Sequence, residues 1–169
     1  MTFQIGEKVV YPNQGVATIE NISSRSFGAQ FERFYLLRLA CSSMTVMVPF
    51  SHVQQVGLRK VTKTSEVSKV LEYLACGTCK CSADWKHRFK ENSDKMQNGS
   101  LLEIAQVFKS LVILQKDKPL SFREKKMLDR SRQMLISEVS AARNLNQAGA
   151  IDAMAKALEK SRLPFPEAM

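Results

Sequence analysis

The sequence predicts an α+β fold in which a small β-barrel is followed by an α-helical bundle. Three observations support this prediction. Apolar residues alternate with a period of two up to about residue 60, and then recur with the helical period of 3.6. Turn signals separate the short alternating segments, and two capping boxes open later helical segments. We therefore expect two domains, residues 1–62 and residues 63–169.

The first domain contains several short segments with strand character. Closing such strands into a small or nearly closed barrel would remove their exposed edges. In the fourth segment, the alternation predicts that Met44, Val46, Val48 and Phe50 point inward, and that Thr45 and Met47 point outward. The expected strands are Val9–Tyr11, Val16–Ser24, Phe31–Leu39, the alternating segment near 44–50, and a short last strand at Val53–Val56, with a hairpin tip at Phe27–Gln30.

The second domain reads as a succession of helices. Lys63-Thr64-Ser65 opens the first, and Ser100 and Ser121 begin the two capping boxes. The helix after Ser100 is apolar on nearly every side, which predicts that it is the most buried. We expect five helices: one that begins at Lys63, one from Trp85 to about Met96, one from Ser100 to Asp117, one from Ser121 to about Arg143, and one over Ala150–Lys160.

The net charge favours a polyanionic partner. The chain has 169 residues and a formal charge of +9; residues 1–62 carry six basic and three acidic side chains, so +6 falls on the remainder. The start has neither a basic n-region nor an apolar run, and no segment is long enough to span a bilayer, so we expect a cytoplasmic protein without a membrane partner. Phosphate-binding glycine loops and a patterned nucleophile triad are absent, so we expect no enzyme and no catalytic residues, although a site assembled in space remains open.

The stretch Asp84–Lys90 is the strongest candidate for a functional site. It contains the only tryptophan of the chain, Trp85, together with Lys86, His87, Arg88 and Lys90. Phe89 and Met96 share a helical stripe with Trp85, which is typical of a core residue. However, Trp85 opens its helix behind a cap at Asp84 or Ser82, and a first-turn side chain can project past the bundle. A planar apolar group among cations suits an opened or bent DNA duplex.

A cysteine tract precedes that helix. Cys76, Cys79 and Cys81 supply three of the four ligands that a structural zinc needs, and His87, His52 or Cys41 would have to complete the set. The usual spacing of two cysteine pairs is absent, so we expect reduced thiols in a loop, with no metal and no cofactor. A metal- or redox-responsive regulator that uses these three cysteines remains an alternative.

Two segments together resemble one family. Gly6–Ala17, with the sequence GEKVVYPNQGVA, resembles the opening of the CarD/CdnL-type bacterial transcription regulators, an opening shared with the polymerase-interacting domain of transcription-repair coupling factors. Trp85-x-x-Arg88-Phe89-Lys90 followed by Lys95-Met96 resembles the carboxy-terminal domain of the CarD type. Ser121-x-x-Glu124-Lys125-Lys126-Met127-Leu128 resembles its later basic helix. The order and spacing match along almost the whole chain.

The resemblance implies a Tudor-like barrel that binds the β subunit of RNA polymerase, and a helical domain that docks on promoter DNA. Trp85 would be the wedge in the minor groove at the upstream edge of the bubble. The implied DNA-binding residues are Trp85, Lys86, His87, Arg88, Lys90, Lys125 and Lys126, and the implied polymerase-binding residues are Arg25 and Met47. Some relatives carry a basic residue where this chain has Met47. We expect a monomer. The alternative function is that of a free-standing architectural DNA-binding protein.

Overall fold

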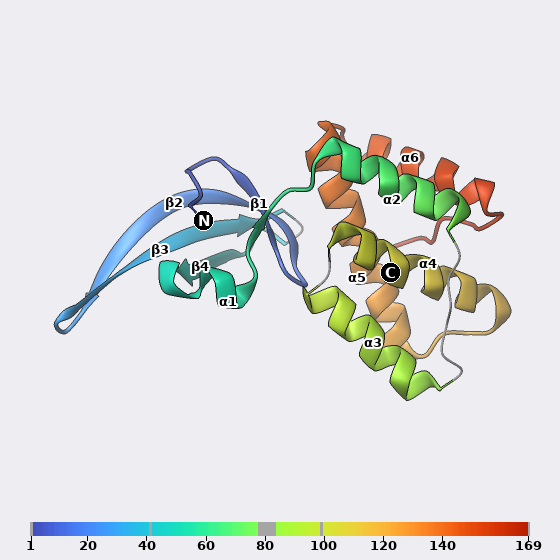
Figure 1. Ribbon diagram of the computed structural model, residues 1–169, viewed down its shortest axis with the longest axis horizontal. Coiled ribbons are helices and arrows are strands. Elements are labelled where there is room, and N and C mark those ends of the chain that lie inside the picture. The colour runs from blue at the N-terminus through green and yellow to red at the C-terminus, as the bar shows by residue number, and fades with distance from the viewer. Residues whose placement is uncertain (1, 41, 78–83, 99, 169) are drawn as a thin grey trace. The chain divides into compact units, whose positions relative to one another are not determined.

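The computed structural model describes residues 2–40, 42–77, 84–98 and 100–168. It divides into two compact units, Met1–Val61 and Thr62–Met169. The first unit is built from strands and the second from helices (Figure 1). The α+β class predicted from the change of hydrophobic period is therefore confirmed.

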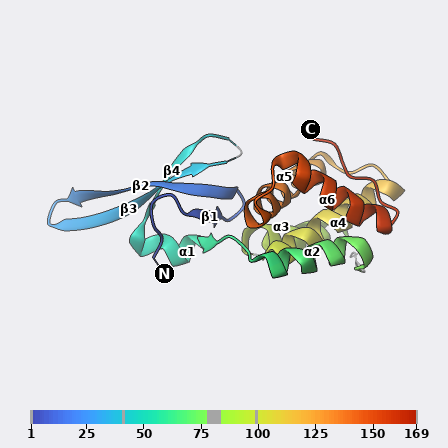
Figure 2. The same ribbon diagram turned by 90° about the horizontal axis from the view of Figure 1, so that it is seen from above.

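The first unit is a five-stranded antiparallel sheet. Its strands are β1 (Lys8–Tyr11), β2 (Gly15–Phe27), β3 (Gln30–Leu39), β4 (Thr45–Pro49) and β5 (Arg59–Lys60), in the order β4-β3-β2-β1-β5. The pairing of β2 with β3 shifts register between Ile19 and Asn21. Such a bulge bends a strand, and β2 and β3 form a long hairpin that is curved in Figure 1 and is seen from above in Figure 2.

The core of this unit lies against one face of the sheet. Tyr35, Leu37 and Leu39 alternate along β3 and are buried, as is Val48 on β4. They pack with residues of the other strands and of the amino-terminal segment. The intervening side chains of β3 and β4 point to the opposite face. The sheet thus has a filled inner face and an outer face that the core does not cover.

Two predictions for this unit are wrong. Val53–Val56 is not a strand but a helical turn, α1, which follows the 3-10 turn η1 (Phe50–His52). Gly57 ends it with φ 83°, the left-handed conformation that terminates helices and favours glycine. Met44 does not point inward: its side chain is 59% exposed, because the strand begins only at Thr45.

The second unit contains five helices among its described residues: α2 (Thr64–Cys76), α3 (Trp85–Asn98), α4 (Leu101–Asp117), α5 (Phe122–Arg143) and α6 (Gln147–Lys160). The predicted caps at Ser100 and Ser121 are confirmed, since each hydroxyl accepts the N–H of the glutamate three residues later. The last helix starts earlier than expected, at Gln147, because Asn146 caps it through the N–H of Gly149.

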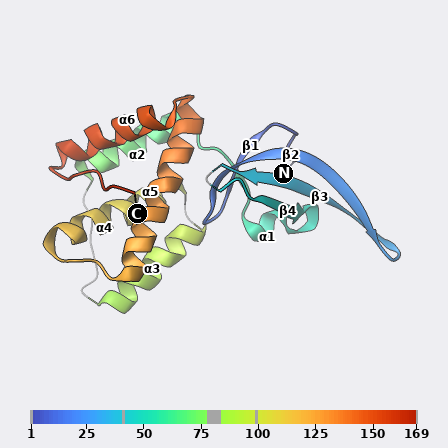
Figure 3. The same cartoon turned by 180° about the vertical axis from the view of Figure 1, so that it is seen from behind.

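Helix α4 is the centre of the second unit. It contacts α2, α3 and α5, and α2 and α6 lie side by side (Figures 1 and 3). Even its Lys109 is buried: the ammonium group donates to the carbonyl oxygens of Tyr73 and Gly77 at 2.9 and 2.7 Å, and to Ser161 Oγ at 3.2 Å. The ammonium group thereby satisfies carbonyls at the carboxyl end of α2, where a positive charge is favoured.

Candidate nucleic-acid interface and polymerase-contacting face

The start of α3 is fixed by Asp84. Its carboxylate accepts the N–H of Lys86 at 3.1 Å, and its carbonyl accepts the N–H of Arg88 at 3.0 Å. Asp84 is therefore the N-cap, one of the two alternatives expected from the sequence; the other, Ser82, lies outside the described residues. This cap holds Trp85 as the first helical residue.

Trp85 is half-exposed. Its side chain is 53% exposed, and it is not part of the core cluster of the helical unit. Further along the same stripe of α3, Phe89 is half-buried and Met96 is buried in that core. The stripe therefore runs from the bundle interior to solvent, and the indole ring occupies its outer end. This geometry leaves a large aromatic surface available to a partner.

Exposed cationic or ionisable side chains lie close to Trp85 in the sequence. Lys86, His87 and Lys90 are all exposed on α3. His87 Nε2 lies 2.8 Å from Glu91 Oε1, and both side chains are more than half exposed. A phosphate that used His87 would have to compete with this carboxylate. Lys86 and Lys90, one helical turn apart, form the lysine pair nearest Trp85 on this helix.

Arg88 lies elsewhere than expected. It is 5% exposed, and its Nε and Nη2 each lie 3.2 Å from Glu124 Oε2 on α5. The side chains of both partners are only 7% exposed. The phosphate contact predicted for Arg88 is not supported by this placement, because its guanidinium is turned into the bundle to neutralise a buried carboxylate. In this structure, Arg88 joins α3 to α5.

The start of α5 completes the same end of the bundle. Glu124 Oε1 lies 3.2 Å from the Ser121 hydroxyl, which also accepts the N–H of Glu124 at 3.3 Å. One carboxylate therefore belongs both to the cap of α5 and to the pair with Arg88. In Figures 1 and 3, the beginnings of α3 and α5 lie at the same end of the helical unit.

The predicted basic residues of α5 lie next to this cap. Lys125 and Lys126 are exposed, and the Lys126 ammonium lies 4.6 Å from the centroid of the Phe122 ring. Phe122 itself is 64% exposed. Sequence reasoning treated Phe122 only as part of a capping box, although an apolar residue at the first position of a capped helix is the same signal that singled out Trp85.

The predicted polymerase-binding residues both lie on the sheet. Arg25 is exposed on β2, and Met47 is 36% exposed on β4. Leu36 pairs with Met47, and Glu32 pairs with Arg25, so alternation places both on the outer face. Sequence reasoning missed Phe27 and Phe34, which the register places on this face too; the exposed Phe27 could have been suspected from its position at the hairpin tip.

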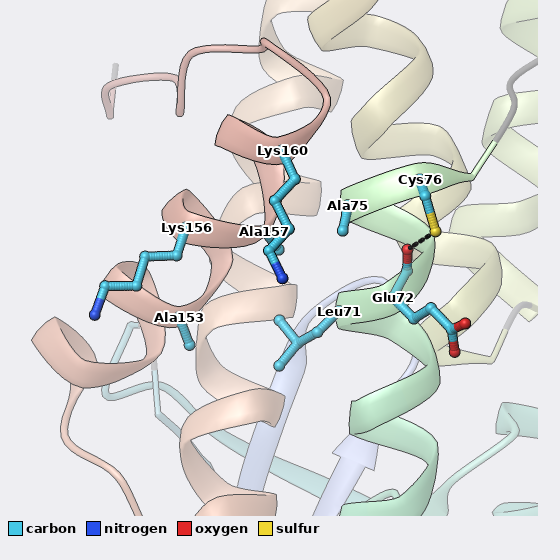
Figure 4. Close-up of a pocket in the computed structure, with 8 residues that line it drawn as sticks. All are labelled: Leu71, Glu72, Ala75, Cys76, Ala153, Lys156, Ala157 and Lys160. Carbon is cyan, nitrogen blue, oxygen red and sulfur yellow. Dashed lines mark hydrogen bonds between the residues drawn. The ribbon is translucent and has the colours of Figure 1, made fainter.

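Two other features are candidate sites: the cysteine tract and a groove between α2 and α6. Cys76 is exposed, and Cys79 and Cys81 lie outside the described residues; within those residues no cluster of three metal-ligating side chains occurs. The groove drawn in Figure 4, about 550 Å³ in volume, lies between α2 and α6, and Leu71, Ala75, Ala153 and Ala157 form its apolar lining. Cys76 also lines it, but none of the predicted DNA-binding or polymerase-binding residues does. Among the described helices, none combines the length and apolarity required to cross a bilayer.

Comparison with known proteins bears on both units. The family model "CarD-like/TRCF RID domain" matches residues 3–62, and the model "CarD, C-terminal domain" matches residues 69–155. The chain is 34% identical over 145 residues to the "Putative transcription factor YdeB" of Bacillus subtilis (strain 168), covering 86% of this chain and 95% of that protein. It is also similar to the solved "CdnLNt from Myxoccoccus xanthus", at 38% identity, covering 36% of this chain and 86% of that one, with a TM-score of 0.31.

These matches define the class of protein, which is a transcription regulator that interacts with RNA polymerase. The chain belongs to the CarD-like family. The amino-terminal sheet is its Tudor-like, polymerase-interacting domain, and the helical unit contains the CarD carboxy-terminal domain. The resemblance inferred from GEKVVYPNQGVA and from the Trp85 segment is therefore confirmed.

Proposed function

We propose that the protein binds the β subunit of RNA polymerase through residues 1–62 and stabilises the promoter open complex through residues 63–169. Trp85 enters the minor groove at the upstream edge of the bubble. Lys86, His87 and Lys90 from α3, with Lys125 and Lys126 from α5, hold the neighbouring phosphates. The observation that carries the proposal is the half-exposed Trp85 at a capped helix start, with exposed cations beside it.

This mechanism acts through binding free energy alone and involves no chemical reaction. Promoter opening is an equilibrium, and a ligand that binds only the open state shifts it by its differential affinity. A ring that stacks on a base at the fork contributes about 1–3 kcal/mol, which changes the ratio of open to closed complex roughly 5- to 150-fold. The proposal requires no base-specific contact, so the position of the promoter on polymerase would decide where the protein acts.

Arg88 enters this mechanism as a positioning residue. It ties the second turn of α3 to the first turn of α5 through Glu124. The two groups of lysines are thereby held relative to Trp85 before DNA arrives. A site ordered in advance loses less conformational entropy on binding, so the contact is stronger than one made by two independently moving helices.

A fluorescent base analogue tests the wedge directly. 2-Aminopurine is placed at the upstream fork of a weak promoter, and its emission rises when the base is unstacked. We expect the full-length protein to raise this emission in the polymerase open complex and Trp85→Ala to raise it less. Equal emission with both proteins would contradict the wedge. Tight binding to the same duplex without polymerase would instead favour the free-standing architectural DNA-binding protein.

A fragment experiment tests which of the two domains binds polymerase. Residues 1–62 should retain the β subunit on a column and show no DNA affinity, while residues 63–169 should not retain the β subunit and should bind DNA only weakly at physiological salt. Polymerase retention by the helical fragment would contradict the assignment of the two domains.

A further inference from the structure

We infer that Glu138 of α5 is a positioning residue that fixes the point at which the chain enters the helical unit. By holding the backbone of Thr62, it reduces the free connection between the sheet and the helices to Val61. The inference rests on the proposed division of polymerase binding and DNA binding between the two units. It goes further by naming the residue that keeps the tether between these two functions short.

The bond between Glu138 and Thr62 belongs to the interior of the helical unit. Glu138 is 2% exposed, and its Oε2 accepts the backbone N–H of Thr62 at 3.0 Å, across 76 positions of the sequence. Both residues lie in the same compact unit, Thr62–Met169. A buried carboxylate is costly unless it is paired or hydrogen-bonded, and hydrogen bonds to ionised groups are among the strong ones. The backbone of Thr62 is therefore held as part of the packing of this unit.

The start of α2 shows what this bond contributes. Lys63 is the N-cap of α2, and a lysine side chain has no acceptor with which to cap a helix. Ser100 and Ser121, by contrast, cap α4 and α5 with their own hydroxyls. Thr62 directly precedes the Lys63 cap, and a carboxylate near a helix amino terminus is favoured by the helix dipole. Glu138 thus fixes, from α5, the backbone at which α2 begins.

On the other side of Val61, the chain is held by the sheet. Lys60 ends β5 and pairs with Val9 of β1, so its backbone belongs to the ladder of the first unit. Val61 is then the one residue between a backbone held by a strand and a backbone held by a carboxylate. One residue supplies only two soft dihedral angles. Loss of the bond to Thr62 would free the chain as far as the cap at Lys63.

A short connection strengthens the second of two linked contacts. Once the sheet is bound to polymerase, DNA engagement by the helical unit is an intramolecular step, and its effective concentration depends on the length and stiffness of the connection. Residues that must be ordered at that step weaken it, because each of them loses backbone freedom. Loss of the anchor should therefore shorten the lifetime of the open complex and leave the Kd for polymerase unchanged.

Amide hydrogen exchange tests the anchor in the full-length protein without polymerase. The Thr62 N–H of the parent should exchange at least about tenfold more slowly than an unstructured amide. Protection should persist in Glu138→Gln, whose side-chain carbonyl can still accept a hydrogen bond, and should disappear in Glu138→Ala. An unprotected Thr62 in the parent, or a protected Thr62 in Glu138→Ala, would overturn the inference.

The lifetime of the open complex on a weak promoter tests the consequence. Glu138→Ala should shorten it about fivefold or more, with the Kd for polymerase within about twofold of the parent, and Glu138→Gln should retain most of it. Leu135→Ala is the matched control for lost stability, because Leu135 is buried in the core on the same helix and does not bond to the connection. At a temperature where both alanine variants are folded, Leu135→Ala should keep the parent lifetime. Equal losses in the two variants would show that Glu138 acts only through stability.

Lengthening the connection supplies a second route to the same effect. Insertion of Gly-Ser between Val61 and Thr62 leaves the bond to Glu138 in place and should also shorten the lifetime. Adding Glu138→Ala to the insertion should shorten it little further, because both changes act on one connection. An insertion with the parent lifetime, or losses that add fully, would overturn the inference. A parent protein that leaves the lifetime unchanged would overturn the proposed function instead, while the exchange measurement still decides whether Glu138 holds Thr62.

Discussion

Replacing Trp85 by alanine separates a wedge from a core residue. Truncating a fully buried large aromatic costs about 3–5 kcal/mol of folding free energy. Trp85 is 53% exposed, so about half of that interaction is available to lose. We therefore expect Trp85→Ala to destabilise the helical unit by roughly 1.5–2.5 kcal/mol, an effect that leaves the protein folded at assay temperature.

Trp85→Ala should lose more of its effect on the open complex than its loss of folding stability alone would cause. If the ring stacks at the fork in the open complex, removing it loses about 1–3 kcal/mol of open-state stabilisation. The lifetime of the open complex on a weak promoter should then fall several-fold. Polymerase binding should stay constant, because it depends on the other unit. Trp85→Phe should keep part of the effect, since a smaller ring still stacks.

Competitor challenge of preformed open complexes measures that lifetime, and thermal unfolding measures the stability. Phe122→Ala is the matched control: Phe122 is also an aromatic first residue of a capped helix and is 64% exposed. It should cost a similar or smaller amount of stability and retain most of the open-complex effect. A Trp85→Ala protein that melts far below the parent yet stabilises open complexes normally would refute the wedge.

The other predictions concern charges. Lys90→Ala should lower the slope of log K against log salt for DNA engagement by about one, whereas Lys156→Ala on α6 should leave it unchanged. Arg88→Leu should cost about 3–5 kcal/mol in thermal or urea unfolding because it strands a buried carboxylate, and adding Glu124→Leu should recover much of the loss; additive losses would contradict the buried pair. Lys109→Met should destabilise by roughly 2–4 kcal/mol, since two carbonyls lose a charged donor; a neutral result would show that other groups satisfy them.

The sequence predicted the elements wherever local chemistry decides them. Ser100 and Ser121 with glutamate three residues later define helix starts whatever surrounds them, and both were found. Val53–Val56 failed because four residues are too few to separate a strand from a helical turn. The spacing of Val53 and Val56 with Gly57 after them was the available helical signal, and the tertiary contacts of Val53 settled it.

The site was only partly predictable for a related reason. The place of Trp85 in the first turn of a capped helix allowed it to be exposed, and the family resemblance decided between that reading and a core residue. The position of Arg88 could not be predicted in this way, because its partner Glu124 lies 36 residues away and had already been assigned to a capping box. A carboxylate has two oxygens, and no periodicity reveals what the second one contacts. Phe27 and Phe34 were missed similarly, since only the strand register brings them together.

The two units suggest why a modest DNA contact is sufficient. The helical unit carries a formal charge of only +6 over more than a hundred residues, and Arg88 is withdrawn into its interior, so phosphate contacts near Trp85 are few. Such a surface binds DNA weakly by itself at physiological salt. A tether to polymerase raises the effective concentration at the fork to about the millimolar range. Salt screens the contacts between lysine and phosphate, so the effect on the open complex should weaken as the salt concentration rises.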